Sequence, residues 1–458
     1  MEARLENVLQ KKIHVEHDSS KDDAKSMASI RLNADRATQT RGDLQTQSTT
    51  QGVQGHETAL IRNDFITDIL LIPPLAHNDA AFSKDTMTYW AMRPPIYPSP
   101  PCSLRMPSVP SSQTLPSKTV ALELVNEAFS SFYSFYPLFD QEDFLQNFHA
   151  HYLGSNPSKT AWWACVNVVL SLAHRLRAMH TSETAYETAQ SCKFAHNALA
   201  VVSPLSLLHN SLPAVQALVG MAVVIQGTPY SDLSLSLIAT ALKLAQIMGL
   251  HRKVQDPSLT EAQAEQRRRV FWMAYFLDKD LSLRMCVPFS QDDNDMDADL
   301  PTVTSSEIQF RDSIYAINFF NSHIGLAVIQ GQIYRGLYSV QATNQPAAQR
   351  AAVAQELNAL LSYWRSGVPI DLEDYPVAPP HHGSLPIEFL HILVLRFTYI
   401  HCLGMIDRHL RQTKELQDDM APEAQGTLTS TESLYILESR KAVRLIKMVP
   451  HGNYPYIW

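Results

Sequence analysis

Closely spaced cysteines are missing from this sequence. Its 458 residues include only five cysteines, and these are scattered without a single C-x-x-C pair: Cys102, Cys165, Cys192, Cys286 and Cys402. Zinc modules and disulfide-framed domains both require closely spaced cysteines, so neither is indicated here. We expect all five cysteines to be single reduced thiols, which is typical of an intracellular protein.

An excess of positive charge is also missing. Lysine and arginine total 37 against 45 aspartate and glutamate residues, which gives a formal net charge of −8. A protein that grips nucleic-acid phosphates over a broad surface has the opposite balance. The charge therefore argues against direct DNA binding by this chain.

No segment is suited to secretion or to a bilayer. The amino terminus, MEARLENVLQKK, is charged and lacks the apolar core of a signal peptide. The longest apolar candidate, Leu385 to Ile406, contains Glu388, His391, Arg396 and His401. We expect this segment to be a buried helix and predict no membrane partner.

Catalytic and cofactor motifs are absent as well. No G-x-S-x-G, Walker or G-x-G-x-x-G sequence occurs. The histidine pairs His149/His151 and His381/His382 have no third ligand nearby in the sequence. The sequence predicts no catalytic residue and no cofactor.

The acidic run from Asp292 to Asp299 does not fit a metal loop. As a calcium loop it would need Gly and Glu where Ala298 and Thr304 stand. As the Asp-Asp-x-x-Asp motif of a terpene synthase it would need an aspartate where Met296 stands. We therefore predict no metal site and expect a solvated acidic loop.

The first quarter of the chain lacks the residues of a core. Residues 1–17 have the pattern of a short helix that resembles the remnant of a coiled coil. Residues 18–117 are rich in Ser, Thr, Gln and later Pro, as in RPPIYPSPPC. Such a composition cannot offset the entropy lost on ordering, so we expect a disordered, proline-rich linker.

Residues 118–450 have what the first quarter lacks, namely long helical patterns separated by polar, proline-marked loops. Hydrophobic residues make up 45% of the chain, which is ample for a core. We predict an all-α domain here, followed by a tail at 451–458. The expected helices are 120–134, 141–152, 160–179, 183–200, 211–226, 233–248, 261–285, 307–338, 347–366, 386–410 and 431–448.

The stretch from Thr240 to Pro301 carries the strongest pattern. Its first helix should end near Gly249, followed by the cations His251, Arg252 and Lys253. Thr260 and Gln263 have the spacing of a capping box, which predicts the start of a second helix that runs to about Met285.

This second helix is too apolar to lie on a surface. Phe271 and Trp272 should be core residues, and Asp278 lies among apolar neighbours. A buried aspartate needs a donor or a cation, and we expect Arg252 or one of the arginines at 267–269. The arginine run itself is typical of an ion-paired or solvated helix turn.

These motifs resemble a known family. AxxLAQxxGLHR, RRRVFW, LDKDLSLR and DxDADLP are similar to the middle homology region of the fungal-specific transcription factor family, the large helical domain of fungal zinc binuclear cluster regulators. FSSFYSFYPLFDQEDF, SLPAVQALVGMAVV and ELNALLSYWRSGVP agree in the same order. The family's usual Gly-Arg-Pro after the long helix is replaced here by Cys286, Val287 and Pro288.

The resemblance implies which residues form the family's structural motif. They are Gly249, Leu250, His251, Arg252, Arg268, Arg269, Phe271, Trp272, Asp278, Pro288, Asp297, Leu300 and Pro301. It also implies a nuclear regulator of fungal metabolic genes, in particular a secondary-metabolite gene cluster. The expected partners are other transcription factors, coregulators or a second copy in a homodimer. DNA is contacted only indirectly unless a zinc cluster is missing from this chain.

The rival hypothesis is an all-α enzyme or small-molecule-binding protein that uses a cavity in the helical bundle. Turnover by the purified protein would favour this rival. Altered transcript levels after deletion would favour the regulator.

Overall fold

A computed structural model describes residues 115–446, except for gaps at 134, 155–158, 181–182, 209, 227–231, 255, 303–305, 311–312, 318, 369–386 and 421–433. Every described element lies within one compact unit of the chain, Pro101–Trp458. The helix expected at 1–17, nearly all of the linker expected at 18–117 and the tail expected at 451–458 lie outside the described residues.

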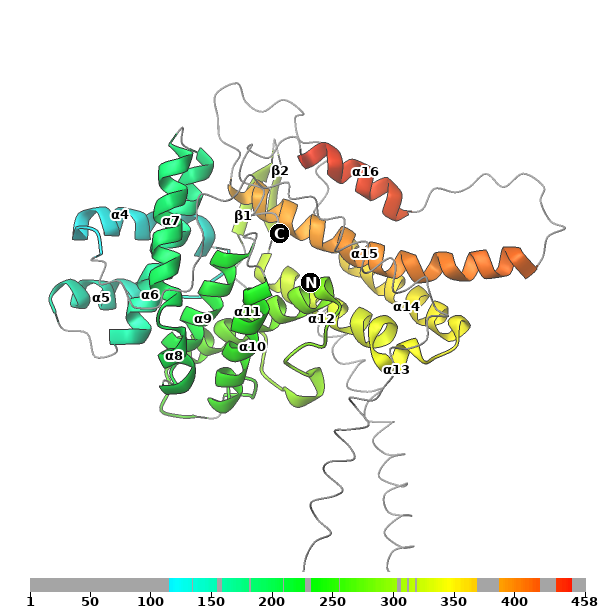
Figure 1. Ribbon diagram of the computed structural model, residues 1–458, viewed down its shortest axis with the longest axis horizontal. Helices are drawn as coiled ribbons and strands as arrows, with labels where there is room; N and C mark the ends of the chain where they lie inside the picture. The colour runs from blue at the N-terminus through cyan, green and yellow to red at the C-terminus, as the bar shows by residue number, and fades with distance from the viewer. Residues whose placement is uncertain are drawn as a thin grey trace, which may run out of the picture. The chain divides into compact units, whose positions relative to one another are not determined.

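The described part of this unit is a packed set of helices (Figure 1), which confirms the all-α prediction. In chain order the elements are α4 Lys118–Ala128, the π-helix η1 Phe129–Tyr133, α5 Gln141–Tyr152, α6 Lys159–His180, α7 Thr184–Leu199, α8 Val202–Leu208, α9 Leu212–Ile225, α10 Asp232–Ile247, α11 Glu261–Met285, the 3-10 helix η2 Asp293–Asp295, β1 Ser306–Phe310, β2 Ser313–Ile317, α12 Phe319–Ile333, the π-helix η3 Tyr334–Tyr338, α13 Val340–Thr343, α14 Ala347–Ser366, α15 Ile387–Met420 and α16 Leu434–Ile446.

The helix expected at 307–338 is wrong over its first part. The strands β1 and β2 form an antiparallel hairpin there, with Ile308 opposite Tyr315, and α12 begins only at Phe319. The strands are five residues each, so their period-two pattern is too short to separate from the helix pattern that follows.

Helix α8 was not predicted at all. Its sequence contains Pro204, which reads as a helix breaker between α7 and α9. In the structure this proline lies in the first turn of α8, where a helix has no internal bond to lose. Helix α15 is also longer than expected, since it continues beyond residue 410 to Met420.

Helix α15 contains the apolar segment considered for a bilayer. Among the described residues one window, Leu390–Arg411, is long and apolar enough to cross a membrane, and 67% of that window is buried inside the protein. Arg396 within it is buried and pairs with Glu438 of α16 at 3.0 Å. These contacts match the buried helix that was expected here.

Among the cysteines that the structure describes, the prediction of a reduced thiol is wrong at Cys192. Cys165, Cys286 and Cys402 are free, but Cys192 is disulfide-bonded. Spacing along the sequence could not reveal this bond, because a disulfide depends on which cysteines the fold brings together.

The core is centred on α9, which packs against α6, α10 and α11. Nearly every residue of α9 is buried. A Cβ atom at Gly220 would lie 2.4 Å from Val168 Cγ1 of α6, so only glycine permits this close approach of the two helices.

The two helices of the strongest motif, α10 and α11, end in the same way. In each, two amide groups beyond the helix donate to carbonyls of its last turn. At α10 these bonds are Gly249 to Gln246 at 3.0 Å and Leu250 to Ala245 at 2.9 Å, and at α11 they are Cys286 to Leu283 at 3.2 Å and Val287 to Ser282 at 3.0 Å. This is the Schellman arrangement, which requires a left-handed residue just past the helix. Gly249 has φ +70° and Cys286 has φ 53°. Cys286 thus occupies a position that favours glycine, which gives a physical reason for the glycine usual at this place in the family.

We predict opposite effects for two substitutions at these caps. Gly249→Ala should lower the free energy of unfolding by about 1 kcal/mol, because alanine is strained in the left-handed region. Cys286→Gly should raise it by about 0.5 to 1 kcal/mol, since relief of strain exceeds the added freedom of the unfolded chain. Chemical denaturation of both variants beside the parent measures the shifts. Shifts of the same sign would contradict the cap assignment.

Candidate functional site

Helix α11 is the element around which the candidate site is built. Thr260 and Gln263 form the predicted capping box, with bonds of 3.2 Å and 3.0 Å between each side chain and the other's amide. The helix then passes through the core, where Phe271 and Trp272 are buried as predicted. Its length and burial allow it to touch different parts of the protein on different faces.

One face of α11 is covered by the chain that follows it. Residues 287–302, here called the return segment, run back along the helix towards its start. Trp272 Nε1 donates to the Asp299 carbonyl at 2.8 Å, and the Tyr275 hydroxyl donates to Asp293 at 2.8 Å. Near the helix start, the Thr302 amide donates to Glu265 at 3.0 Å.

Asp278 is bound by the return segment, not by an arginine. The residue is fully buried, and its carboxylate accepts the backbone amides of Ser290 at 2.9 and 3.0 Å and of Gln291 at 3.1 Å. The expected pairing with Arg252 or an arginine of 267–269 is therefore wrong. Burial raises the pKa of Asp278, and the bonds from the two amides oppose this rise.

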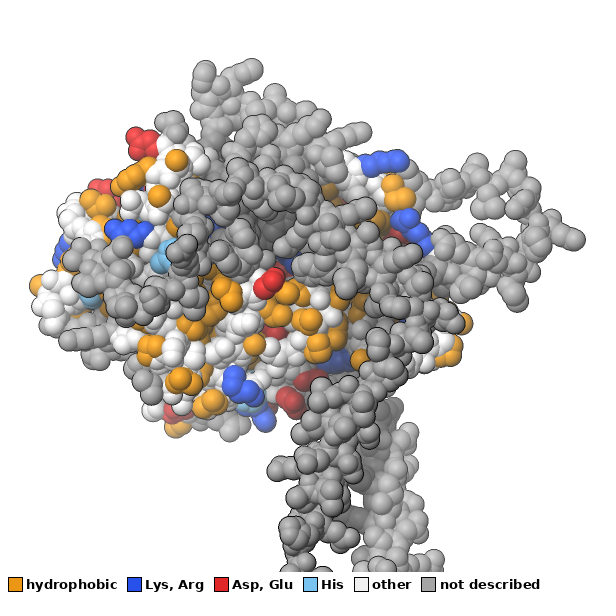
Figure 2. Space-filling model, in the orientation of Figure 1, with side chains coloured by type: hydrophobic (Ala, Val, Ile, Leu, Met, Phe, Trp, Pro, Cys, Tyr) orange, Lys and Arg blue, Asp and Glu red, His pale blue; other side chains and the backbone are white. Residues whose placement is uncertain are grey.

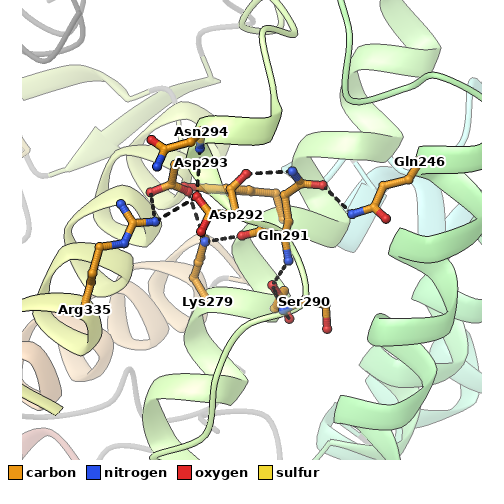
Figure 3. A network of polar contacts seen from close by, with 10 residues as sticks. Gln246, Lys279, Ser290, Gln291, Asp292, Asp293, Asn294 and Arg335 are labelled. Atoms are coloured by element: carbon orange, nitrogen blue, oxygen red, sulfur yellow. Dashed lines mark hydrogen bonds and ion pairs between the residues drawn. The ribbon is translucent and has the colours of Figure 1, made fainter. Parts of the chain in front are cut away.

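Lys279, the next residue, is buried and ion-paired within the network shown in Figure 3. Its Nζ lies 3.0 Å from Asp293 Oδ1, donates to the Gln291 carbonyl at 2.6 Å, and sits 3.3 Å from the centre of the Phe289 ring. Burial lowers the pKa of Lys279, and the Asp293 carboxylate opposes this. Arg335 of η3 also reaches Asp293, at 3.7 Å.

The expectation of a solvated acidic loop at residues 292–299 is wrong in part, because one of its aspartates is buried. The side chain of Asp293 is 6% exposed and holds Lys279, whereas that of Asp292 is 48% exposed and pairs with Arg335 at 3.1 Å. Gln291 is fully buried and accepts a bond from Gln246 of α10 at 2.9 Å (Figure 3). The loop therefore joins α10, α11 and η3.

The end of the return segment lies against the turn after α10. The His251 carbonyl accepts the amides of Asp297 and Ala298 at 3.0 and 3.1 Å. Arg252 grips the Asp297 carboxylate with bonds of 2.8 and 3.2 Å on the exposed surface. The motif residues Gly249, Leu250, His251, Arg252 and Asp297 thus form this junction, and Leu300 and Pro301 follow it along the chain. Pro288 is not part of the junction, because it lies exposed at the other end of the return segment.

The arginine run is an ion-paired helix turn, as predicted. Arg268 and Arg269 bond to Glu265 at 2.9 and 2.8 Å. Arg267 donates to the Met248 carbonyl at the end of α10, at 3.1 Å. These contacts fasten the first turns of α11 and leave the arginines little freedom for other partners.

A second face of α11 lines a cavity of about 120 Å³. The walls come from η1, α6, α9, α11, α12 and α15 and are mostly apolar or aromatic. From α11 come Met273, Phe276, Leu277, Asp280 and Arg284. Their spacing of three and four residues marks one helix face, but no sequence pattern could show that five other elements would complete the walls.

The charged groups in the cavity wall are paired with each other. Asp280 bonds to Arg284 at 2.7 Å and accepts from Gln330 of α12 at 2.8 Å. Two histidines, His323 and His391, are buried among aromatic rings beside them. In the part of the chain that the structure describes, no group of three or more His, Cys, Asp or Glu residues is placed to hold a metal ion.

The chain is similar in sequence to fungal transcription factors. Residues 127–366 match the fungal specific transcription factor domain. The ABC-transporter-regulating transcription factor of Aspergillus oryzae is 33% identical over 357 residues, which cover 75% of this chain and 40% of that protein. The Fusaridione A cluster transcription factor fsdR of Fusarium heterosporum is 35% identical over 274 residues, covering 59% of this chain and 52% of that one.

More distant relatives carry less specific names. An uncharacterized transcriptional regulatory protein of Schizosaccharomyces pombe is 28% identical over 342 residues, 73% of this chain and 50% of its own length. The chain thus spans about half or less of the length of these relatives. No solved structure matches it.

We predict that Asp278→Asn lowers the free energy of unfolding by about 1 to 3 kcal/mol. The new amide group would face a backbone N–H donor, which would be left buried without an acceptor. Asp295→Asn is the control, because Asp295 is exposed in the same segment and should shift stability by no more than about 0.5 kcal/mol. Thermal or chemical melts of the two variants decide the matter, and equal small shifts would contradict the role given to Asp278.

We also predict that acid destabilises the protein through its buried histidines. Burial lowers the pKa of His323 to about 4 and that of His391 to about 3. In the unfolded chain the same two histidines take up protons near pH 6.5. Since they do not do so in the folded protein, the free energy of unfolding should fall as pH falls from about 6.5 to 4.

Each of these rings should contribute a slope of about 1.4 kcal/mol per pH unit. Denaturation across this pH range should therefore show a shallower slope for His323→Phe than for the parent. His149→Gln, at an exposed position of α5, is the control. An unchanged slope in His323→Phe would show that folding does not lower the pKa of His323.

Proposed function

The chain belongs to the fungal specific transcription factor family, and from this premise we propose that it regulates the transcription of fungal metabolic genes, foremost those of a secondary-metabolite biosynthetic cluster. The observation that carries the proposal is the family match over residues 127–366. This range extends from the end of α4 to the end of α14 and includes both described faces of α11. The regulatory part is residues 118–450, which act as one helical domain.

The names of the relatives support a metabolic target. The Fusarium relative is named for the Fusaridione A cluster, and the Aspergillus oryzae relative for the regulation of an ABC transporter. Transporter genes and biosynthetic genes both serve the handling of small organic molecules. A biosynthetic gene cluster is therefore the favoured target, with transporter genes as the second choice.

The chain acts in the nucleus and reaches DNA through partners. Its net charge of −8 disfavours a broad phosphate-binding surface. On the face shown in Figure 2, Lys and Arg side chains of the described residues occur in small groups between acidic and apolar ones. The partners are coregulators, other transcription factors or a second copy of the chain, and its role is regulatory, not enzymatic.

Deletion of the gene tests the proposed function. Transcript profiling of the deletion strain should show coordinated change in a set of neighbouring biosynthetic genes, and reintroduction of the gene should reverse it. Reintroduction of Asp295→Asn, at an exposed position, should reverse it equally well. Unchanged transcripts, together with turnover of a metabolite by the purified protein, would favour an enzyme instead.

We predict that the purified chain does not retain promoter DNA of its target genes sequence-specifically at physiological salt. True sequence readers bind with dissociation constants of about 10⁻⁸ to 10⁻¹¹ M, and the negative charge of this chain opposes such binding. Gel retardation with the promoter and a scrambled duplex of equal length gives the comparison. A nanomolar complex with the promoter alone would contradict indirect DNA recognition.

A further inference from the structure

Helix α10 has apolar side chains on its outer side as well as on its inner one. Its inner side packs against α9 and α11, with Leu237, Ile238 and Leu242 buried. On the outer side, Leu233 is 38% exposed and Ile247 is 61% exposed. Packing of the domain core therefore does not account for these two residues.

The outer residues of α10 form one stripe along the helix, here called the α10 face. Leu233, Ser236, Thr240, Lys243 and Ile247 follow one another at alternating intervals of three and four residues. This spacing places them on one side of a helix, and it is the spacing by which two helices pack along each other. Thr240 is half-buried and the other four are exposed.

The α10 face carries very little charge. In the sequence, Lys243 is the only lysine, arginine, aspartate or glutamate between Asp232 and Arg252. The solvent side of a helix is usually rich in charged residues, whereas the centre of a protein interface is depleted of them. The composition of this face is therefore that of a contact surface.

The two charged residues beside this face have no ion partner among the described residues. Asp232, the first residue of α10, and Lys243 form no ion pair with another described residue, and the Lys243 amine donates to the Gln246 side chain at 2.9 Å. Eleven residues separate the two charges, which is close to three helix turns or about 16 Å. They thus lie on the same side of the helix but cannot reach each other.

A second copy of the same helix supplies a partner for both charges. In an antiparallel pair related by a twofold axis, Leu233 of each copy lies towards Ile247 of the other. Asp232 and Lys243 stay on one flank of the contact, so that each aspartate faces the lysine of the other copy. A parallel pair would set like charges against each other, which is unfavourable.

We propose that the α10 face binds a second copy of this chain, with the two α10 helices antiparallel about a twofold axis near Thr240. The contact names one partner of the proposed regulatory function and rests on that function only for its role in the cell. Because the contact is measured on the purified protein, unchanged transcripts after gene deletion would leave it intact.

Sedimentation of the purified full chain over a range of concentrations tests the contact. The face of one helix is smaller than a standard interface of about 800 Å² per partner, so we expect a dimer with a dissociation constant in the micromolar range. Ile247→Glu should weaken it at least tenfold, because it places two charges in the apolar contact. Leu153→Glu, at a leucine that is 77% exposed beyond α5, should leave it unchanged.

Two results of this experiment would overturn the proposal. One is a parent protein that stays monomeric at every concentration up to millimolar. The other is a dimer that Ile247→Glu does not weaken.

A charge exchange tests the antiparallel arrangement. Lys243→Asp should weaken the dimer about tenfold, because two ion pairs are replaced by two pairs of like charges. Adding Asp232→Lys to the same chain should restore the affinity, since each new lysine then faces a new aspartate of the other copy. A folded double variant that dimerises as weakly as Lys243→Asp would contradict this arrangement.

A measurement on the unaltered protein keeps the proposal testable if a variant does not fold. With methyl-labelled isoleucines, the NMR signal of Ile247 should shift as the protein is diluted and the dimer dissociates. The signal of Ile238, which is buried on the inner side of the same helix, should stay in place. An Ile247 signal that does not move during dissociation would place the contact elsewhere and overturn the assignment.

Discussion

Three consecutive ionisable residues at the centre of the protein set the main constraint on its structure. Asp278, Lys279 and Asp280 lie side by side on a buried helix, where an unpaired charge is highly unfavourable. Since successive helix residues point in different directions, each needs its own partner. Backbone amides at 290–291 bind Asp278, Asp293 pairs with Lys279, and Arg284 and Gln330 bind Asp280.

This constraint ties together elements that are far apart in the sequence. The return segment must lie along α11, because it alone supplies the partners of Asp278 and its Asp293 is the ion partner of Lys279. Arg335 of η3 and Gln330 of α12 reach the two sides of the same helix turn. A shift of α12 would therefore be felt both at the return segment and at the cavity wall.

The sequence predicted those features that depend on neighbours along the chain. The capping box of Thr260 and Gln263, the helix end at Gly249 and the burial of Trp272 follow from local spacing and from the apolar stripe. The partner of Asp278 could not be predicted, because the donors are backbone amides and carry no residue-type signal. The hairpin after the return segment was missed because its strands are short.

The cavity was beyond prediction for a related reason. Its wall combines side chains from six helical elements, and these side chains come together only once the elements are packed. The sequence marked His391 only as a polar residue in an apolar helix, which suggested burial without a role. The hypothesis of a cavity in the helical bundle was general, and no residue of its lining could be named in advance.

The burial of Lys279 has a consequence for the kinetics of the protein. Its amine has no exposed surface and lies beneath Asp293 and Phe289. An acylating reagent that modifies exposed lysines within minutes can reach Lys279 only while the return segment is detached from α11. The acylation rate of this one amine therefore reports how often the segment opens, in the absence of denaturant and without any engineered label.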